Sequence, residues 1–276
     1  MKFAVVVITG SGNAQCFREV GETLVHGIRA LGYECADLLW QQFLPDVTHI
    51  VLAWNMIEHV PTMVPPPGSV LYNLEQILPG LTDFGRVVPW LGNPNYRIWD
   101  YSLSNISALK TVNVNNVTHV PIGYYDGLTC APVAEEDIDV VFTGNMNERR
   151  QRMWQRLIDK RWRVAHISGT FGVERDRWIA RGRVHLNMHW WFPQCVFEEV
   201  RCSYLLANRA VVVSENGDPN GESTYRDVIQ FCNYDEIPSV IERVLSTDRQ
   251  ALKEQGLTLV RSRRVETILD IPLRSL

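Results

Sequence analysis

Cysteine is scarce in this sequence, and none of it follows a pattern that binds metal or builds a disulfide framework. The six cysteines among 276 residues stand at positions 16, 35, 130, 195, 202 and 232, and no two form a CxxC pair. Structural zinc sites and small disulfide-rich domains both depend on such spacings. We therefore expect reduced thiols in a cytoplasmic protein, with no metal site.

Long hydrophobic runs are lacking too. The apolar run in MKFAVVVITGSG spans about seven residues and ends at Gly10, whereas a membrane-spanning helix needs about 20. No signal-peptide cleavage pattern follows it. We expect neither a membrane span nor a targeting segment.

An excess of positive charge is the third absence. The net charge is −4, which provides no electrostatic case for a nucleic-acid partner. The charge is unevenly spread, however, with six Lys/Arg against ten Asp/Glu up to Cys130 and 21 of each sign afterwards. The arginine-rich second half is where we expect an anionic ligand.

The order of elements indicates two α/β domains. A chain of 276 residues that is 46% hydrophobic is longer than most chains that fold around a single compact core. The proline-containing segment CAPVAEED separates two series of short β-branched runs, so we divide the chain into residues 1–130 and 131–276. The tail from Arg249 is helical in composition and can pack back towards the first domain. Strands are expected at 3–8, 35–40, 48–53, 69–73, 97–99, 139–142, 163–167 and 228–232, and helices at 17–31, 148–160 and 237–245.

The loop ITGSGNAQ after the first strand partly matches the dinucleotide fingerprint. The third glycine position is occupied by Gln15, and without that glycine the helix packs less closely on the strand, which weakens an NAD interpretation. We expect instead a glycine loop facing a cleft, the alternative being a plain strand-to-helix turn. The loop residues are Gly10, Ser11, Gly12 and Asn13.

The segment FTGNMNERR suits a phosphate. Gly144 permits close backbone approach, Asn145 and Asn147 can donate hydrogen bonds, and Arg149 or Arg150 can bind phosphate through two donors. The alternative is that Asn147 caps the helix while both arginines lie in solvent.

Polar and aromatic residues end the next long strand. Alternation places His185, Asn187 and His189 on one side of it. His189 can contact a phosphate or a sugar hydroxyl, or it can be a structural histidine bonded to backbone. The tryptophans that follow can stack on a base or sugar, or belong to the core.

Two carboxylates open the helix that begins near Phe197. Acidic groups there lie beside unpaired backbone N–H groups and the positive end of the helix dipole. A diphosphate can bind those N–H groups while Glu198 holds ribose hydroxyls and Glu199 compensates the dipole. Arg201, on the same helix face as Glu198, can position that carboxylate or reach phosphate. The alternative is that both acids merely favour a helix start.

With these segments, the chain resembles the GT-B glycosyltransferases, close to the group-1-type and CgeB-like (spore-protein-like) families. The likeness rests on HVPIG near residue 120, FTGNMNERR, GTFGVERDRWIARGRVHLN and FEEVRCSYLLANRAVVVSE, and it is strongest from Asp137 to Glu215. It implies an α/β fold of two Rossmann-like domains facing across a cleft, with the donor bound by the second and the acceptor by the first. The donor-binding residues are then expected to be Gly144, Asn145, Asn147, Arg149, Arg150, Gly169, Gly172, Phe197, Glu198 and Arg201.

One departure from the family pattern concerns catalysis. The family has a further glutamate eight residues before the ribose-binding one, and here that position is Trp190, so its role is vacant or passes to His189. Inverting members need a base from the first domain, for which Glu75 and Asp100 are candidates at strand ends; either can instead be structural, and retaining members need no such base.

We therefore expect a metal-independent transfer of sugar from a nucleotide-diphosphate donor, as co-substrate, to an unidentified hydroxyl. Backbone N–H groups and arginines would stabilise the leaving group, with no separate cofactor. The pair Asp137 and Asp139 precedes a strand, at the edge opposite to where such sheets bind ligands, so we interpret it as a linker edge. The alternatives are a non-catalytic nucleotide-sugar-binding protein and a nucleotide-sugar epimerase of the same fold.

Overall fold

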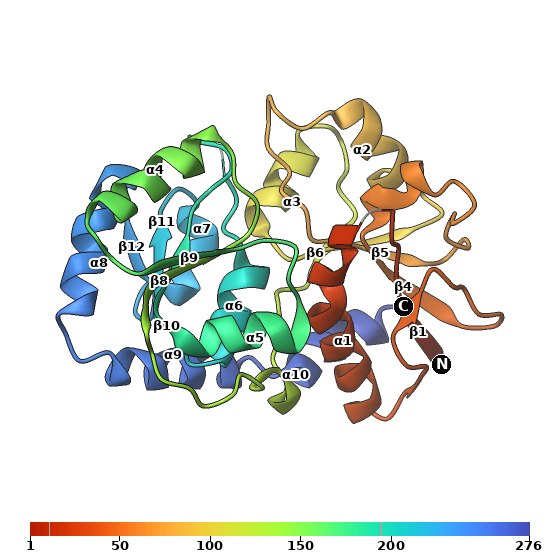
Figure 1. The fold of residues 1–276 in the computed structure, drawn as a ribbon. Coiled ribbons are helices and arrows are strands. Elements are labelled where there is room, and N and C mark those ends of the chain that lie inside the picture. The colour runs from red at the N-terminus through yellow and green to blue at the C-terminus, as the bar shows by residue number, and fades with distance from the viewer. Residues whose placement is uncertain (11, 194) are drawn as a thin grey trace. The chain divides into compact units, whose positions relative to one another are not determined.

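The computed structural model describes residues 1–10, 12–193 and 195–276 and divides into two compact units (Figure 1). Unit 1 comprises Met1–Tyr125 together with Arg263–Leu276, and unit 2 comprises Asp126–Ser262. The division falls at Tyr125 and not after Cys130 because the Asn208 side chain binds the intervening backbone. Its Oδ1 accepts from Cys130 N at 2.9 Å, and its Nδ2 donates to Leu128 O at 2.9 Å.

Unit 1 is built on a parallel sheet in the order β2-β1-β4-β5-β6-β7, with β3 also paired to β1. The strands are short and rich in β-branched and aromatic residues, which suits burial on both faces. They are β1 (Lys2–Val7), β2 (Glu34–Cys35), β3 (Leu39–Trp40), β4 (Thr48–Leu52), β5 (Val70–Asn73), β6 (Arg97–Asp100) and β7 (Val117–His119).

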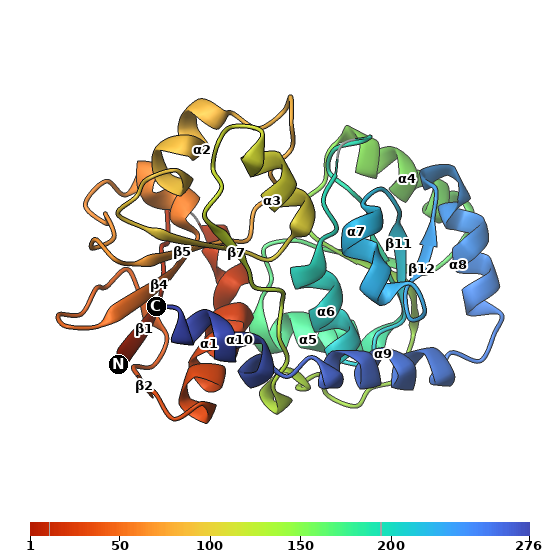
Figure 2. The ribbon, with the colours of Figure 1, turned by 180° about the vertical axis from the view of Figure 1, so that it is seen from behind.

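Helices cover both faces of this sheet. The described helices are α1 (Arg18–Ala30), α2 (Phe84–Leu91), α3 (Leu103–Lys110) and α10 (Val265–Arg274), with 3-10 turns η1 (Gly12–Phe17) and η2 (Trp54–His59). On one face, Leu91 of α2 and Leu109 of α3 share a core with Val51 and Ile98. α1 and α10 lie side by side (Figure 2). A Cβ at Gly27 would lie 2.8 Å from Val265 and one at Gly123 would lie 2.8 Å from its backbone, so these glycines allow α10 to dock.

Unit 2 repeats the plan with a parallel sheet in the order β12-β11-β10-β8-β9. The strands are β8 (Ile138–Thr143), β9 (Val164–Ile167), β10 (Gly182–Asn187), β11 (Val212–Glu215) and β12 (Gln230–Cys232). The described helices are α4 (Glu148–Asp159), α5 (Gly172–Arg181), α6 (Glu199–Ala207), α7 (Pro219–Glu222), α8 (Ile237–Leu245) and α9 (Gln250–Ser262), with 3-10 turns η3 (Asp126–Leu128), η4 (Ser223–Tyr225) and η5 (Tyr234–Glu236).

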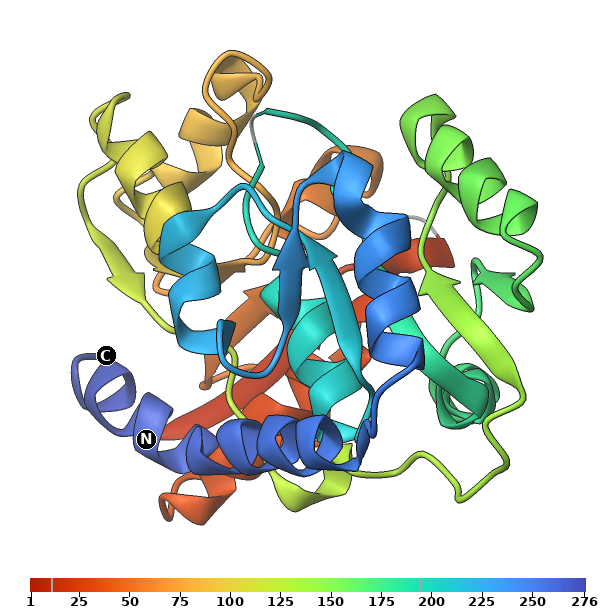
Figure 3. The same ribbon diagram turned by 90° about the vertical axis from the view of Figure 1, so that its left-hand side faces the viewer.

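Alternate residues of β8 face different helices in unit 2. Val140 and Phe142 pack with α4 and α8, which are the light green helix at the upper right of Figure 3 and the upright blue helix near its centre. Val141 points to the other face, where Trp178 of α5 packs against it. Among the described residues, no helix is long and apolar enough to span a membrane.

Most strands lie where the sequence indicates, with one clear difference. The single strand expected at 35–40 is two short strands, β2 and β3, which pair with opposite ends of β1. Between them Asp37 is exposed and accepts from Arg29 of α1 at 2.8 Å. The chain therefore leaves the sheet in the middle of an apparently continuous run.

Candidate functional site

The strand order of unit 2 places a topological switch point between β8 and β10, because the chain moves to opposite sides of β8 to form β9 and β10. Ligands of open α/β sheets bind at such points, outside the carboxyl ends of the strands. Three segments meet there. Arg201 of α6 donates to Asn187 Oδ1 at the end of β10 at 2.7 Å, and its Nη2 would lie 3.2 Å from a Cβ placed on Gly144 after β8.

Arg150 is the most enclosed charge of this region. Its side chain is 3% exposed, and it donates to Asn145 O at 2.8 Å, to Met188 O, and to Glu198 Oε1 at 3.3 Å. Burial lowers the pKa of the guanidinium to about 10 against the attraction of Glu198, so the group remains a cation at neutral pH. Its hydrogen bonds hold the exit loops of β8 and β10 together.

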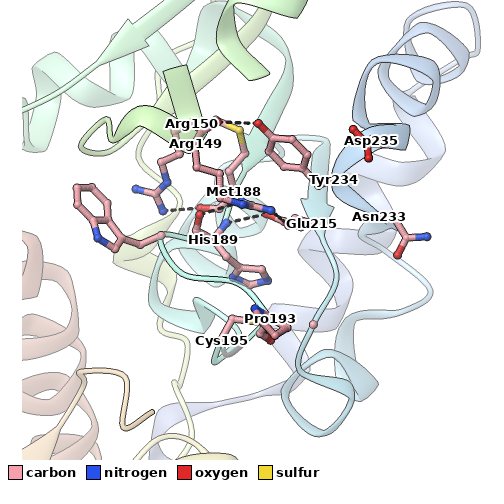
Figure 4. A network of polar contacts seen from close by, with 12 residues as sticks. Arg149, Arg150, Met188, His189, Pro193, Cys195, Glu215, Asn233, Tyr234 and Asp235 are labelled. Atoms are coloured by element: carbon pink, nitrogen blue, oxygen red, sulfur yellow. Dashed lines mark hydrogen bonds and ion pairs between the residues drawn. The ribbon is translucent and has the colours of Figure 1, made fainter. Parts of the chain in front are cut away.

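Arg149 forms a second, separate set of contacts (Figure 4). It makes two hydrogen bonds to the fully buried carboxylate of Glu215, at the end of β11, one of them 2.8 Å long. Its guanidinium carbon lies 4.1 Å from the centre of the Tyr234 ring, and Tyr234 donates to Arg149 O at 2.6 Å. Neither arginine of this pair is simply solvated, which was the alternative interpretation of the segment.

The two carboxylates that open α6 have different surroundings. The Glu198 side chain is 14% exposed and pairs with both Arg150 and Arg201. Glu199 is buried and its Oε1 accepts from the Tyr225 hydroxyl at 2.7 Å. Only Glu198 therefore combines partial exposure with the arginines of the switch point.

The other expected donor-side residues lie in the segments that follow β8, β9 and β10. Asn147 caps α4 by accepting from Arg150 N at 2.9 Å, and it also donates to Trp190 O at 2.9 Å. Gly169 and Gly172 have φ of +65° and +58°, in the left-handed region that favours glycine, and a Cβ on either would meet open space. Phe197 is buried, with its N–H donating to Asp218 Oδ2 at 2.9 Å.

His189 is fully buried directly beyond β10. Its backbone N–H donates to Glu215 Oε2 at 3.1 Å. Neither ring nitrogen has a hydrogen-bond partner within the part of the chain that the structure describes. By contrast, His185 contacts Ile179 O at 3.1 Å, as a structural histidine does. The Trp190 ring lies 5.2 Å from the Arg150 guanidinium.

The switch point carries a group of three arginines. Arg149, Arg150 and Arg201 face two carboxylates, Glu198 and Glu215. Arg149 and Arg201 keep side-chain exposures of 19% and 25%, so both can still donate to a ligand. In residues 1–10, 12–193 and 195–276, no cluster of three or more His, Cys, Asp or Glu is placed to hold a metal.

In unit 1, Asp100 lies at the end of β6 inside a buried amide cluster. Its carboxylate accepts from Asn73 Nδ2 at 2.6 Å, Ser102 N at 2.8 Å and Asn105 Nδ2 at 3.0 Å. Burial raises the pKa of this carboxyl to about 7 against those three hydrogen bonds. Asp100 is fully buried, so a substrate hydroxyl cannot reach it without a rearrangement.

Glu75 follows β5 and is exposed, although desolvation of its carboxylate raises the pKa against a 3.4 Å hydrogen bond from Asn55. Asn73 and Asn105 both donate to its backbone carbonyl, at 3.0 Å and 2.8 Å. The amide cluster around Asp100 therefore positions Glu75. Of the two candidate bases, Glu75 is the one accessible to a ligand.

The glycine loop also lies in unit 1. A Cβ on Gly10 would lie 3.1 Å from both Met56 and His59 of η2, so the loop runs close to that turn. Gly12 and Asn13 are in the first turn of η1, and Ser11 is outside the described residues.

The pair Asp137 and Asp139 lies at the amino edge of the unit 2 sheet. Asp137 receives two hydrogen bonds from Arg181, at 2.8 and 2.7 Å, and Asp139 accepts from Arg183 at 2.8 Å. Both carboxylates thus connect the start of β8 to arginines at or next to the start of β10.

Sequence reasoning missed several residues that build the two sites. A charged residue that ends a buried strand, as Glu215 does in VVVSE, is a signal that could have been used. The roles of Asn73 and Asn105 had no such signal, because they depend on contacts between strands β5 and β6 and helix α3. The missed residues are Asn55, Asn73, Asn105, Glu215, Asp218, Tyr225 and Tyr234.

Comparison with known sequences finds relatives but no matching family model. Uncharacterized protein R358 of Acanthamoeba polyphaga mimivirus is 30% identical over 217 residues, which cover 75% of each chain. A second uncharacterized protein of the same virus is 24% identical over 276 residues, covering 95% of this chain and 87% of the relative.

Solved structures of glycosyltransferases share the fold of the whole chain. The DNA-modifying enzyme β-glucosyltransferase aligns with a TM-score of 0.59 at 12% identity, over 100% of this chain and 99% of the enzyme. AviGT4, of avilamycin A biosynthesis, aligns with a TM-score of 0.62 at 14% identity, over 99% of this chain and 96% of AviGT4. Sucrose-phosphate synthase of Thermosynechococcus elongatus aligns with a TM-score of 0.63 at 10% identity, over 100% of this chain and 98% of the synthase. The predicted fold class is confirmed: the chain has two Rossmann-like units and the GT-B glycosyltransferase fold.

Proposed function

We propose that this chain, which belongs to the same protein family as the uncharacterized mimivirus protein R358, transfers a sugar from a nucleotide-diphosphate donor to a hydroxyl acceptor. The observation that carries the proposal is the set of three arginines at the switch point of unit 2, of which Arg149 and Arg201 keep partly exposed side chains. Guanidinium groups with exposed donors at the carboxyl ends of parallel strands suit a diphosphate.

The relatives in structure support the same reaction class. Two solved structures of the T4 phage glucosyltransferase hold UDP-glucose, and sucrose-phosphate synthase shares the fold across the whole chain. We therefore assign a uridine or other nucleoside diphosphate sugar as donor. Within the GT-B enzymes we place the chain near the group-1-type and CgeB-like families, on the motifs of residues 137–215.

The donor would lie across the exits of β8 and β10. Glu198 would accept from the ribose hydroxyls, since its carboxylate is partly exposed and is held by Arg150 and Arg201. Arg149 and Arg201 would donate to the diphosphate, assisted by backbone N–H groups at the start of α6. Phe197 would fix that helix start through its bond to Asp218.

In the transfer, the bond between the anomeric carbon and the diphosphate oxygen breaks, and that oxygen leaves with the electron pair. A bond forms between the anomeric carbon and the acceptor oxygen, whose proton is lost. For an inverting reaction Glu75 would take that proton, and desolvation raises the pKa of its carboxyl, which makes the carboxylate a stronger base. For a retaining reaction the departing phosphate can take it.

We further propose that the reaction needs no metal ion, because arginines and N–H groups stabilise the leaving charge. Assays in EDTA test this part. Activity that disappears in EDTA and returns with Mg²⁺ would overturn it. Proton NMR of the product gives the anomeric configuration, and an inverted product from a fully active Glu75→Gln variant would remove Glu75 as the base.

The first experiment is a thermal-shift titration of the full chain with UDP, GDP, ADP and dTDP. A nucleotide present at about one hundred times its dissociation constant should add about 2.7 kcal/mol of apparent stability. If no nucleoside diphosphate raises the unfolding temperature, the proposal fails.

A second candidate function is donor binding without turnover. It is favoured by Trp190, which stands where related enzymes carry a further glutamate, and by the burial of His189 beside it. Donor binding without product or donor hydrolysis would identify such a protein. Consumption of donor into another nucleotide sugar, with no acceptor present, would instead identify an epimerase.

A further inference from the structure

Unit 1 contains a cavity at the carboxyl end of β4, lined only by residues of that unit. Its volume is about 350 Å³, within the usual range for small-molecule sites. One wall is η2, which follows β4, and the other is α2 with the residue that caps it. The lining residues are Trp54, Asn55, Met56, Glu58, His59, Asp83, Arg86, Val87 and Trp90.

The cavity adjoins the candidate base. Asn55, on its wall, donates to Glu75 Oε1 at 3.4 Å. Asn55 therefore connects the wall of the cavity to the Glu75 carboxylate, which lies next to the cavity.

The walls combine aromatic faces with paired charges. Trp90 is partly exposed and stacks on Tyr96 behind it, with 6.2 Å between ring centres. Arg86, on the same α2 wall as Trp90, makes two hydrogen bonds to Glu58 of the η2 wall, one of them 3.2 Å long. Asp83 is exposed, with one oxygen accepting from Gly85 N at 2.9 Å.

This chemistry fits a neutral ligand with many hydroxyl groups. Two carboxylates against one guanidinium leave a negative excess, which repels phosphate and other polyanions. Carboxylates and a guanidinium can accept from and donate to sugar hydroxyls, and the electron-rich face of an indole attracts the C–H face of a pyranose ring.

We propose that this cavity binds a neutral saccharide as the acceptor, one ring lying on Trp90 between Glu58 and Asp83, with its reacting hydroxyl directed to Glu75. This rests on the proposed glycosyl transfer and specifies the substrate class that the transfer uses. The switch point of unit 2 binds the anionic donor, and the cavity of unit 1 selects an uncharged acceptor.

The test is isothermal titration calorimetry of the full chain with maltose, cellobiose and N,N′-diacetylchitobiose. At least one should bind, and Trp90→Ala should weaken that binding about tenfold, the value of one favourable aromatic contact. Trp90→Phe should retain most of the affinity because it keeps a ring face. Arg86→Ala, on an exposed side chain, should also weaken binding without loss of the fold.

Tyr33→Ala is the matched control, because Tyr33 lines a different hollow of the same unit, beside Lys2 and Glu34. It should leave saccharide affinity unchanged. UDP affinity by thermal shift should be equal in wild type and Trp90→Ala, so the acceptor site and the donor site are tested separately. If the chain binds a disaccharide but no nucleotide, the proposed glycosyl transfer is refuted and the saccharide site is not.

Three results would overturn the inference itself. The first is that none of the three disaccharides binds. The second is that Trp90→Ala and Arg86→Ala both bind the disaccharide as tightly as wild type. The third is that short duplex DNA or another polyanion competes for the cavity and loses affinity in Trp90→Ala.

Discussion

The two units share a strand order but differ in the polar groups at the carboxyl ends of their strands. In unit 1, β1 lies between β4 on one side and β2 with β3 on the other, and in unit 2, β8 lies between β9 and β10, so each sheet has a switch point beside its first strand. Unit 2 places guanidinium–carboxylate pairs there, around Arg150 and Glu215. Unit 1 carries a cluster of amides around one buried carboxyl, Asp100, at the ends of β5 and β6 and not at its switch point.

This difference shows that the fold determines where ligands bind, and that the residues at the carboxyl ends of the strands determine which ligands bind there. Arginines that keep exposed donors suit an anion, whereas the amide cluster carries no excess cation and serves to hold Glu75. The charged residues of unit 2 and the amide cluster of unit 1 should therefore respond differently to substitution.

The largest effect is expected from Glu215→Gln. The carboxylate is fully buried, so the substitution leaves the Arg149 guanidinium without its counter-charge, which should lower the free energy of unfolding of unit 2 by about 3–5 kcal/mol. Urea denaturation measures the loss, and hydrogen exchange of unit 1 amides should stay as in wild type.

Asp235→Asn is the control, since Asp235 pairs with Arg156 on the surface. Exposed ion pairs contribute little, so its unfolding curve should nearly match that of wild type. Equal destabilisation by the two variants would show that the Glu215 pair is not the special feature of unit 2.

The next effect is a pH dependence that originates in unit 1. The pKa of Asp100 is about 7 in the folded chain, above its ordinary value of 3.8. The folded state therefore holds a proton that the unfolded state has lost, so stability falls as pH rises from about 4 to about 7 and is level above that.

Over this range wild type should lose roughly 4 kcal/mol relative to Asp100→Asn, since three pKa units correspond to about that energy. The measurement is the difference between their unfolding free energies at several pH values. A difference that stays constant with pH, or that grows in favour of wild type, would contradict the buried carboxyl as the titrating group.

The smallest effect separates the two acids of α6. Glu198→Ala should weaken UDP binding by about 1.5–3 kcal/mol through loss of a charge-assisted bond to ribose. The same substitution should change the affinity for 2′,3′-dideoxy-UDP much less, because that analogue lacks the hydroxyls.

Glu199→Gln should leave UDP affinity almost unchanged, because Glu199 faces Tyr225 and the amide keeps an acceptor for that hydroxyl. Calorimetry with both nucleotides distinguishes the variants. An equal loss for UDP in both, or a larger one for Glu199→Gln, would assign ribose binding to the wrong carboxylate.

Local signals in the sequence predict much of the fold. Helix α8 begins and ends as expected at Ile237 and Leu245, because apolar spacing and a proline in the first turn mark it. One interpretation of the sequence makes Asn147 a helix cap, and it does cap α4. The break between β2 and β3 was missed because Asp37 alone, within an apolar run, does not reveal where the chain leaves the sheet.

The sites were less predictable than the strands. The segments near 144, 187 and 198 could be assigned to one sheet edge from the order of elements. The pairing of Arg149 with Glu215 could not, because it joins residues 66 positions apart and depends on strand register. The assignment of ribose to Glu198 and of the proton to Glu75 stays a prediction that the experiments above address.

The docking of α10 at Gly27 and Gly123 affects the order in which the chain can fold. Unit 1 is made of two stretches separated by all of unit 2, so unit 2 is an insertion within it. During synthesis, residues 1–125 emerge first but lack the helix that covers α1 until residues 263–276 follow. Domains generally fold as units during synthesis, and here the later unit, continuous from Asp126 to Ser262, is the first whose residues are all present on the nascent chain.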